Sequence, residues 1–170
     1  MCIKNIYLDV VKQLEGELGH LIPVVVANDG DDTALAGAMD LKENGVLGIA
    51  MGTSEAGGYV DPQGNITGWI NELAFVPVDY NTDAMVDEWS GDYGCGVKYF
   101  SQDGVIKLAP FAGITLDENL SPAEKLKVVQ GLMEKGDHNA ADIYDTIGAY
   151  FGYAIAYYSE FYDIKHVLIM

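Results

Sequence analysis

The sequence contains no arginine and only nine lysines against 26 acidic residues, which gives this 170-residue chain a formal net charge of −17. Nucleic acids and anionic membrane surfaces would be repelled by such a charge, so neither is expected as a partner. No apolar run approaches the roughly 20 residues that a membrane-spanning helix needs. The first residues have the pattern of an amphipathic helix rather than a signal peptide. Together these absences predict a cytoplasmic protein.

Cysteine is also scarce, because Cys2 and Cys95 are the only two in the chain. Two separated cysteines cannot form a disulfide framework, and a reducing compartment is the simpler interpretation. Hydrophobic residues make up 49% of the sequence, enough for one substantial core. A single domain is therefore expected.

The N-terminal half has the pattern of an α/β domain. Apolar residues recur every fourth position from Ile6 to Leu18 and predict a first helix that ends near Gly19. A short helix is expected in "DDTALAGAMDL", and turn residues around Pro62 predict a hairpin. The segment 81–104 has weak periodicity and much Gly and Asp, which indicates a partly ordered excursion. We expect four strands in one sheet, at 22–28, 45–52, 56–61 and 74–80.

The C-terminal third has the pattern of two helices and a strand. A capping box from Ser121 to Glu124 opens a helix through about Glu134, and a longer helix is predicted over 139–162. On this longer helix Gly148, Gly152 and Ala156 form a small-residue stripe, which predicts tight packing on the sheet. The final "KHVLIM" has the pattern of a buried strand, so we expect the sequence to be a piece of a longer protein.

The order of these pieces resembles the ROK family of sugar kinases and repressors, within the actin-like, hexokinase-like ATPase superfamily. A strand ends in Asn-Asp, a helix of small residues follows, and a second strand leads into Gly-Thr and a Gly-rich hairpin. The resemblance implies an α/β fold, an RNase H-like (actin-like ATPase) domain with a mixed sheet flanked by helices. It also implies that residues 1–170 form a single C-terminal lobe, without the N-terminal lobe that completes the nucleotide cleft.

The first motif, from Pro23 to Asp29, is similar to the family's "PVVVEND". On that likeness Asp29 is the catalytic base and Asn28 contacts the sugar. A carboxylate at a strand end suits this role, because it can accept the proton of a sugar hydroxyl during phosphoryl transfer. The alternative is that Asp29 or Asp31 caps the following helix. Asp31 and Asp32 are assigned to the helix N-terminus, where negative charge is favourable.

The second motif, "GIAMGTSEAGGYVD", is similar to the family's phosphate-binding hairpin "GTGIGGGI". Glycine allows backbone amides to approach phosphate oxygens closely. The resemblance therefore implies ATP with Mg as cofactor. A Gly-rich hairpin without a ligand is the alternative. The residues that match the phosphate-binding positions are Gly52, Thr53, Gly57 and Gly58.

Three residues of this hairpin depart from the family pattern. Ser54 and Ala56 replace glycines, and their Cβ atoms leave less room for phosphate oxygens to approach the backbone amides. Glu55 stands where an apolar residue is usual. A carboxylate close to a triphosphate is repulsive by roughly 1 to 4 kcal/mol, so these departures count against nucleotide binding.

The third motif, "GWINELAFVPVDY", is similar to the family's "AGEIGHMPV". Glu72 matches an acid that contacts sugar hydroxyls, whereas Phe75 replaces the family's His. A solvated or capping role for Glu72 is the alternative. Further on, Cys95 is the only cysteine left of the family's zinc segment, and Val97 replaces the acid that follows it. One cysteine cannot hold zinc, so no metal site is expected in the protein.

Two functions of different class follow from these motifs. The first is the C-terminal lobe of a ROK-like carbohydrate kinase, which phosphorylates a sugar hydroxyl with ATP and is inactive without its other lobe. The second is a degenerate, non-catalytic relative that senses a ligand or serves in assembly. A third possibility, suggested by the net charge of −17, is an acidic interaction domain that binds no ligand. Association into a homo-oligomer stays open.

Overall fold

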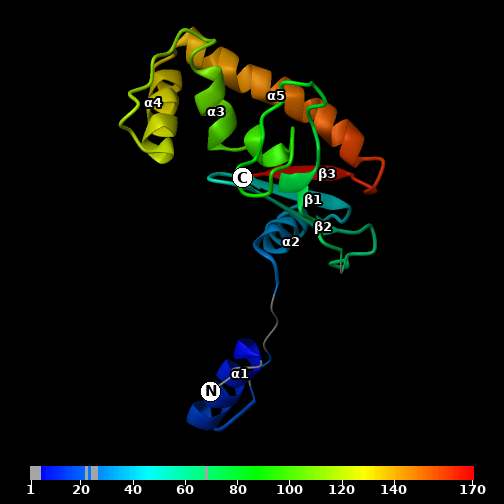
Figure 1. Ribbon diagram of the computed structural model, residues 1–170. Coiled ribbons are helices and arrows are strands. Elements are labelled where there is room, and N and C mark those ends of the chain that lie inside the picture. Colours follow the sequence, from blue (N-terminus) through cyan, green and yellow to red (C-terminus); the bar gives the residue numbers. More distant parts are fainter. Residues whose placement is uncertain (1–4, 22, 24–26, 68) are drawn as a thin grey trace.

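The structure is a computed structural model that describes residues 5–21, 23, 27–67 and 69–170. Figure 1 shows a small sheet with helices on both sides and a first helix that lies apart from them. None of the helices in the described ranges combines the length and apolar character that crossing a membrane requires. The elements are α1 (Ile6–Leu18), α2 (Asp29–Leu41), β1 (Val46–Met51), β2 (Glu55–Val60), the 3-10 helices η1 (Leu73–Phe75) and η2 (Gly96–Lys98), α3 (Gln102–Leu108), α4 (Pro122–Glu134), α5 (His138–Tyr158) and β3 (His166–Ile169).

The sheet has three strands in the order β2-β1-β3. β1 and β2 form an antiparallel hairpin, in which Met51 pairs with Glu55. β1 and β3 are parallel, and Val46 pairs with His166. A parallel pair needs a long crossover connection, which α3, α4 and α5 supply here. The mixed sheet flanked by helices that the sequence predicts is confirmed.

The two faces of the sheet carry different cores. α2 packs on one face, where Ala34 and Ala38 meet Val46 and Val60. α5 and η1 cover the other face. A second cluster, within α3, α4 and α5, lies beyond the sheet. The buried residues of the α5 face are Leu47, Ile49, Tyr59, Leu73, Phe100, Phe151, Ala154 and Tyr158.

The N-terminal turn of α2 lies unusually close to β2, because glycines face each other there. A Cβ built on Gly58 would lie 1.9 Å from the carbonyl oxygen of Gly30. A Cβ built on Gly30 would lie 2.0 Å from the carbonyl oxygen of Gly57. Only glycine permits this backbone-to-backbone contact, so these residues fix where α2 begins relative to the hairpin.

Several predicted elements are confirmed with their caps. α1 ends at Gly19, which has φ 72° and donates its N–H to the carbonyl of Glu15. α4 begins with the predicted capping box, in which Ser121 and Glu124 satisfy each other's backbone N–H groups. The segment around Pro62 is a turn rather than a helix, and Val60 bridges to Ile66 beyond it. The apolar stripe of α1 is exposed, however, since no residue of that helix is buried.

The predicted strand 74–80 is wrong, because η1 occupies its start and the rest joins no strand of the sheet. Pro77 has no N–H to offer a ladder, and Val78 and Asp79 both donate their N–H groups to the carbonyl of Gly94. These residues pair with the excursion 81–104 instead. The predicted strand 22–28 lies largely outside the described residues, and positions 27 and 28 have no regular structure.

Two predictions for the C-terminal half also need correction. The glycines of α5 do not pack on the sheet: Gly148 and Gly152 are exposed, and a Cβ at either would meet nothing within 4 Å. The apolar side of α5 that contacts the sheet is instead built from larger residues, among them Phe151 and Tyr158. α3 was not predicted: it begins in the last residues of the 81–104 excursion and continues to Leu108, and Ser101 caps it by accepting the N–H of Asp103.

Candidate functional site

Asn28 and Asp29 stand at the N-terminus of α2, and both are exposed. Asn28 is the N-cap residue, whose Oδ1 accepts the N–H of Gly30 at 2.9 Å. Oδ1 of Asp29 accepts the same N–H at 3.0 Å. The N-cap is thus Asn28 rather than Asp29 or Asp31, which the capping alternative named, although Asp29 shares the bond from the N–H of Gly30. Each exposed side chain retains acceptor capacity, because an amide oxygen has two lone pairs and a carboxylate has about four lone-pair sites.

Asp31 and Asp32 lie in the first turn of α2, as their sequence position predicts. Asp31 has an additional contact, since its Oδ1 accepts a hydrogen bond from Nδ2 of Asn71 at 3.3 Å. Oδ1 of Asn71 in turn accepts one from the hydroxyl of Tyr162 at 3.0 Å. This chain of hydrogen bonds joins the α2 N-terminus, the segment that carries Glu72, and the end of the C-terminal helical region.

Glu72 is exposed and immediately precedes η1, without a side-chain capping bond there. It lies at the edge of a groove of about 540 Å³. Aromatic rings dominate the groove: those of Trp69 and Tyr162 lie 5.9 Å apart, and Tyr59 contacts both. The other residues that line it are Ile70, Leu73, Phe75, Val76, Pro77, Tyr157, Tyr158 and Phe161.

This aromatic groove was not predicted from the sequence. Its residues come from two segments about 90 positions apart, so no local motif joins them. One signal was present: "YAIAYYSEFYD" places Tyr157 and Phe161 four residues apart, and their rings pack edge to face at 5.4 Å. A carboxylate beside aromatic faces suits a ligand with hydroxyls on one side and C–H groups on the other.

The four predicted phosphate-binding residues fall into two environments. Gly52 and Thr53 lie in the exposed turn between β1 and β2, and a Cβ on Gly52 would meet nothing within 4 Å. Gly57 and Gly58 are buried within β2. The side chain of Leu73 covers Gly57, and the backbone of Gly30 covers Gly58. The open turn leaves room for phosphate, whereas the two buried glycines are already in contact with the rest of the chain.

Glu55 does not point into that turn. Its side chain is buried on the α5 face, and a Cβ on Gly96 would lie 2.3 Å from its Oε2. Burial raises the pKa of Glu55 to about 8, so roughly a tenth of the molecules carry its charge at pH 7. The expectation that Glu55 repels a triphosphate therefore needs correction. Within the described residues neither carboxyl oxygen has a hydrogen-bond partner.

The segment that resembles the family's zinc site is held by a lysine. Nζ of Lys98 lies 2.7 Å from a carboxylate oxygen of Glu88 and 2.7 Å from one of Asp103. Cys95 is buried nearby as a free thiol. In the described part of the chain no group of three or more His, Cys, Asp or Glu side chains is placed to hold a metal ion. The absence of zinc in solution stays a prediction.

No protein-family model matches the sequence, and no curated protein matches it. Solved structures do match. A ROK family glucokinase from Streptomyces griseus, in complex with glucose and AMPPNP, has 20% identity and a TM-score of 0.70 over 94% of this chain and 55% of its own.

Two further solved structures show the same likeness. A ROK family transcriptional regulator, a homologue of the E. coli MLC protein, has 23% identity and a TM-score of 0.72 over 98% of this chain and 43% of its own. A ROK hexokinase from Thermus thermophilus has 21% identity and a TM-score of 0.67 over 94% and 52%. This chain thus spans about half the length of these proteins, and it has the actin-like ATPase fold that they share.

Proposed function

We propose that this chain is the C-terminal lobe of a ROK-like carbohydrate kinase, which transfers a phosphoryl group from ATP to a sugar hydroxyl. The observation that carries the proposal is the Asp31–Asn71 hydrogen bond, because it holds the segments of Asp29 and Glu72 together. The likeness to sugar kinases, one of them in complex with glucose and AMPPNP, supports it. Catalysis would need the N-terminal lobe, and we assign the protein to the cytoplasm.

Each residue has a distinct task in this proposal. Asp29 accepts the proton of the sugar hydroxyl, as a general base. Asn28 and Glu72 hold neighbouring hydroxyls, and the groove rings cover the apolar side of the sugar. Gly52 and Thr53 contact phosphate through the open turn, while Gly57 and Gly58 keep the hairpin against α2.

ATP with Mg, when bound, supplies the phosphoryl group and neutralises its developing charge. In the exposed turn the N–H of Gly52 already donates to the carbonyl of Ser54, so the turn would offer phosphate the backbone N–H and the hydroxyl of Thr53. Lys98 is held by its two carboxylates and lies in the 81–104 segment, so it is not assigned to phosphate.

The experiment compares wild type with Asp29→Asn in the complete protein, using ADP release with a panel of hexoses and amino sugars. The side-chain oxygen of an Asn at position 29 can still accept the N–H of Gly30, and Asn28 remains the N-cap, so the melting temperature should change little. Turnover should fall by about 10²-fold or more. Asp32→Asn is the matched control, because it removes the same charge from the same helical turn. Equal rates for wild type and Asp29→Asn would refute the base assignment.

The second candidate is a non-catalytic lobe that senses a ligand or serves in assembly. One observation favours it: Phe75, at the position of the family's His, packs on Trp89 with ring centroids 5.6 Å apart. This apolar contact supplies no ligand to a sugar. If the complete wild-type protein binds a hexose in calorimetry but releases no ADP with any sugar, the sensor function replaces the kinase.

A further inference from the structure

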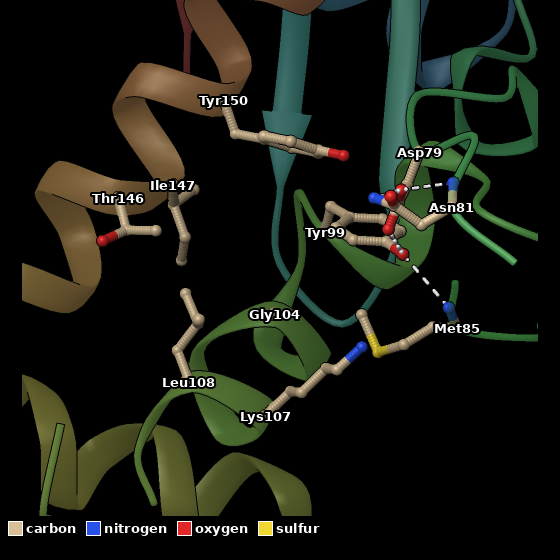
Figure 2. A pocket seen from close by; sticks show the side chains of 10 residues that line it. All are labelled: Asp79, Asn81, Met85, Tyr99, Gly104, Lys107, Leu108, Thr146, Ile147 and Tyr150. Atoms are coloured by element: carbon tan, nitrogen blue, oxygen red, sulfur yellow. Dashed lines mark hydrogen bonds between the residues drawn. The ribbon is translucent and has the colours of Figure 1, made fainter. Parts of the chain in front are cut away.

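A separate pocket of about 250 Å³ lies between α3, α5 and the start of the 81–104 excursion. Figure 2 shows it bounded by Tyr99 on one side and by Leu108 and Ile147 on the other. None of the residues assigned above to sugar or phosphate lines it. Its volume corresponds to one small molecule, somewhat below the usual range of drug-sized sites.

One end of the pocket carries an ionised carboxylate. Oδ2 of Asp79 accepts the hydroxyl of Tyr99 at 2.6 Å, and its Oδ1 accepts both the backbone and the side-chain N–H groups of Asn81. Desolvation acts to raise the pKa of Asp79, but these hydrogen bonds and the charge of Lys107 outweigh it and hold the pKa below its usual value. These bonds use three of about four acceptor positions. The hydroxyl of Tyr150 also lies close to the carboxylate: desolvation raises the pKa of Tyr150, and the charge of Asp79 helps to raise it further.

A cation lies beside the ring of the same Tyr99. Nζ of Lys107 lies 5.8 Å from the ring centroid of Tyr99, within the range of a cation–π contact. In Figure 2 the ammonium group of Lys107 lies next to the side chain of Met85. Within the described residues both ion pairs belong to Lys98, so Lys107 keeps its donors for a ligand.

Aromatic and aliphatic side chains form much of the remaining pocket wall. The ring of Tyr150 stacks on Tyr99 with a centroid distance of 5.4 Å and an angle of 30°. Leu108 and Ile147 face these rings across the pocket, and both pack onto the helical core cluster of α3, α4 and α5. The positions of the two walls are therefore set by buried packing rather than by an exposed loop.

We propose that this pocket binds a free α-amino acid with a large apolar side chain. The ligand ammonium would contact Asp79, its carboxylate would contact Lys107, and its side chain would lie between Tyr150 and Ile147. A simple anion is disfavoured by a net charge of −17. A simple cation leaves Lys107 unpaired and adjacent to like charge. A zwitterion offers an opposite charge to both Asp79 and Lys107 without adding net charge.

The test is isothermal titration calorimetry on the complete chain with L-phenylalanine, L-leucine and glycine. Phenylalanine and leucine should bind with dissociation constants of about 1 mM or tighter, and glycine at least about tenfold more weakly. N-acetyl-L-phenylalanine lacks the ammonium and L-phenylalaninamide lacks the carboxylate. Each should bind at least about tenfold more weakly than phenylalanine, since hydrogen bonds to charged groups are the stronger kind.

Lys107→Met tests the carboxylate end without disturbing a buried group, because Lys107 is exposed. It should weaken phenylalanine binding about tenfold or more and leave the binding of phenylalaninamide nearly unchanged. Lys127→Met, also an exposed lysine on a neighbouring helix, is the matched control and should bind as wild type does. The proposal is overturned if phenylalanine shows no binding at 10 mM, a concentration about tenfold above the expected constant. It is also overturned if Lys107→Met binds phenylalanine normally, or if phenylacetate binds as tightly as phenylalanine.

Discussion

Glu55 makes the stability of this protein depend on pH in an unusual direction. Its side chain is 4% exposed, both carboxyl oxygens lack hydrogen-bond partners among the described residues, and burial raises its pKa from 4.5 to about 8. Below pH 4.5 the folded and unfolded states are both protonated at this residue. Between that pH and about 8, only the unfolded state releases the proton. Stability is therefore lost as the pH rises through this window, by about 1.4 kcal/mol per unit.

The variant Glu55→Gln removes the titration while keeping the size of the side chain. Relative to wild type, its free energy of unfolding should be raised by about 2 kcal/mol at pH 6 and about 3 kcal/mol at pH 7, after subtracting the difference at pH 4.5. Urea denaturation followed by circular dichroism at half-unit pH steps measures this. Glu72→Gln is the control, because the same change at an exposed carboxyl should leave the pH profile close to that of wild type. Parallel profiles for Glu55→Gln and wild type would refute the reasoning.

Three further substitutions test the packing. Gly58→Ala places a Cβ against the Gly30 carbonyl and should cost about 3 kcal/mol or more of unfolding free energy, which thermal or urea denaturation measures. Gly148→Ala meets no neighbour within 4 Å and should stabilise α5 by about 0.5 to 1 kcal/mol; a loss of stability there would show a contact that the structure lacks. Lys98→Met leaves Asp103 without its cation, while the exposed Glu88 remains solvated, and should cost about 1 kcal/mol, whereas Lys107→Met should change stability little in the same urea titration.

Local signals were enough to predict most helices and the central strands. The capping box of Ser121 and the glycine after α1 act within one helical turn, so their effect is visible in a few neighbouring residues. The segment 74–80 is different. Its apolar residues satisfy a strand pattern, but the choice between joining the sheet and pairing with Gly94 depends on contacts far along the chain. Tertiary pairing overrode the local preference there.

The sequence predicted individual residues of the candidate site but not the hydrogen bonds that join their segments. The resemblance located Asn28, Asp29 and Glu72, whereas the hydrogen bonds through Asn71 join residues 40 and 91 positions apart. The burial of Glu55 could have been inferred from the alternation of side chains along a strand. Residues at alternate positions share a face, so Glu55 lies on the same side as Gly57 and the core residue Tyr59. That alternation already predicts burial of its carboxyl.

The glycine contacts between α2 and β2 explain where Asn28 and Asp29 lie, but not whether these residues act on a substrate. Because Gly30 meets Gly57 and Gly58 backbone to backbone, the start of α2 cannot move relative to the hairpin without breaking the core. Asn28 and Asp29 are thereby fixed beside the sheet whether or not they act on a substrate. A kinase and a sensor would both need this rigid placement, so the fold alone favours neither. What distinguishes them is the proton of the sugar hydroxyl, which only a kinase has to remove, and this is why Asp29→Asn with Asp32→Asn beside it is the decisive comparison.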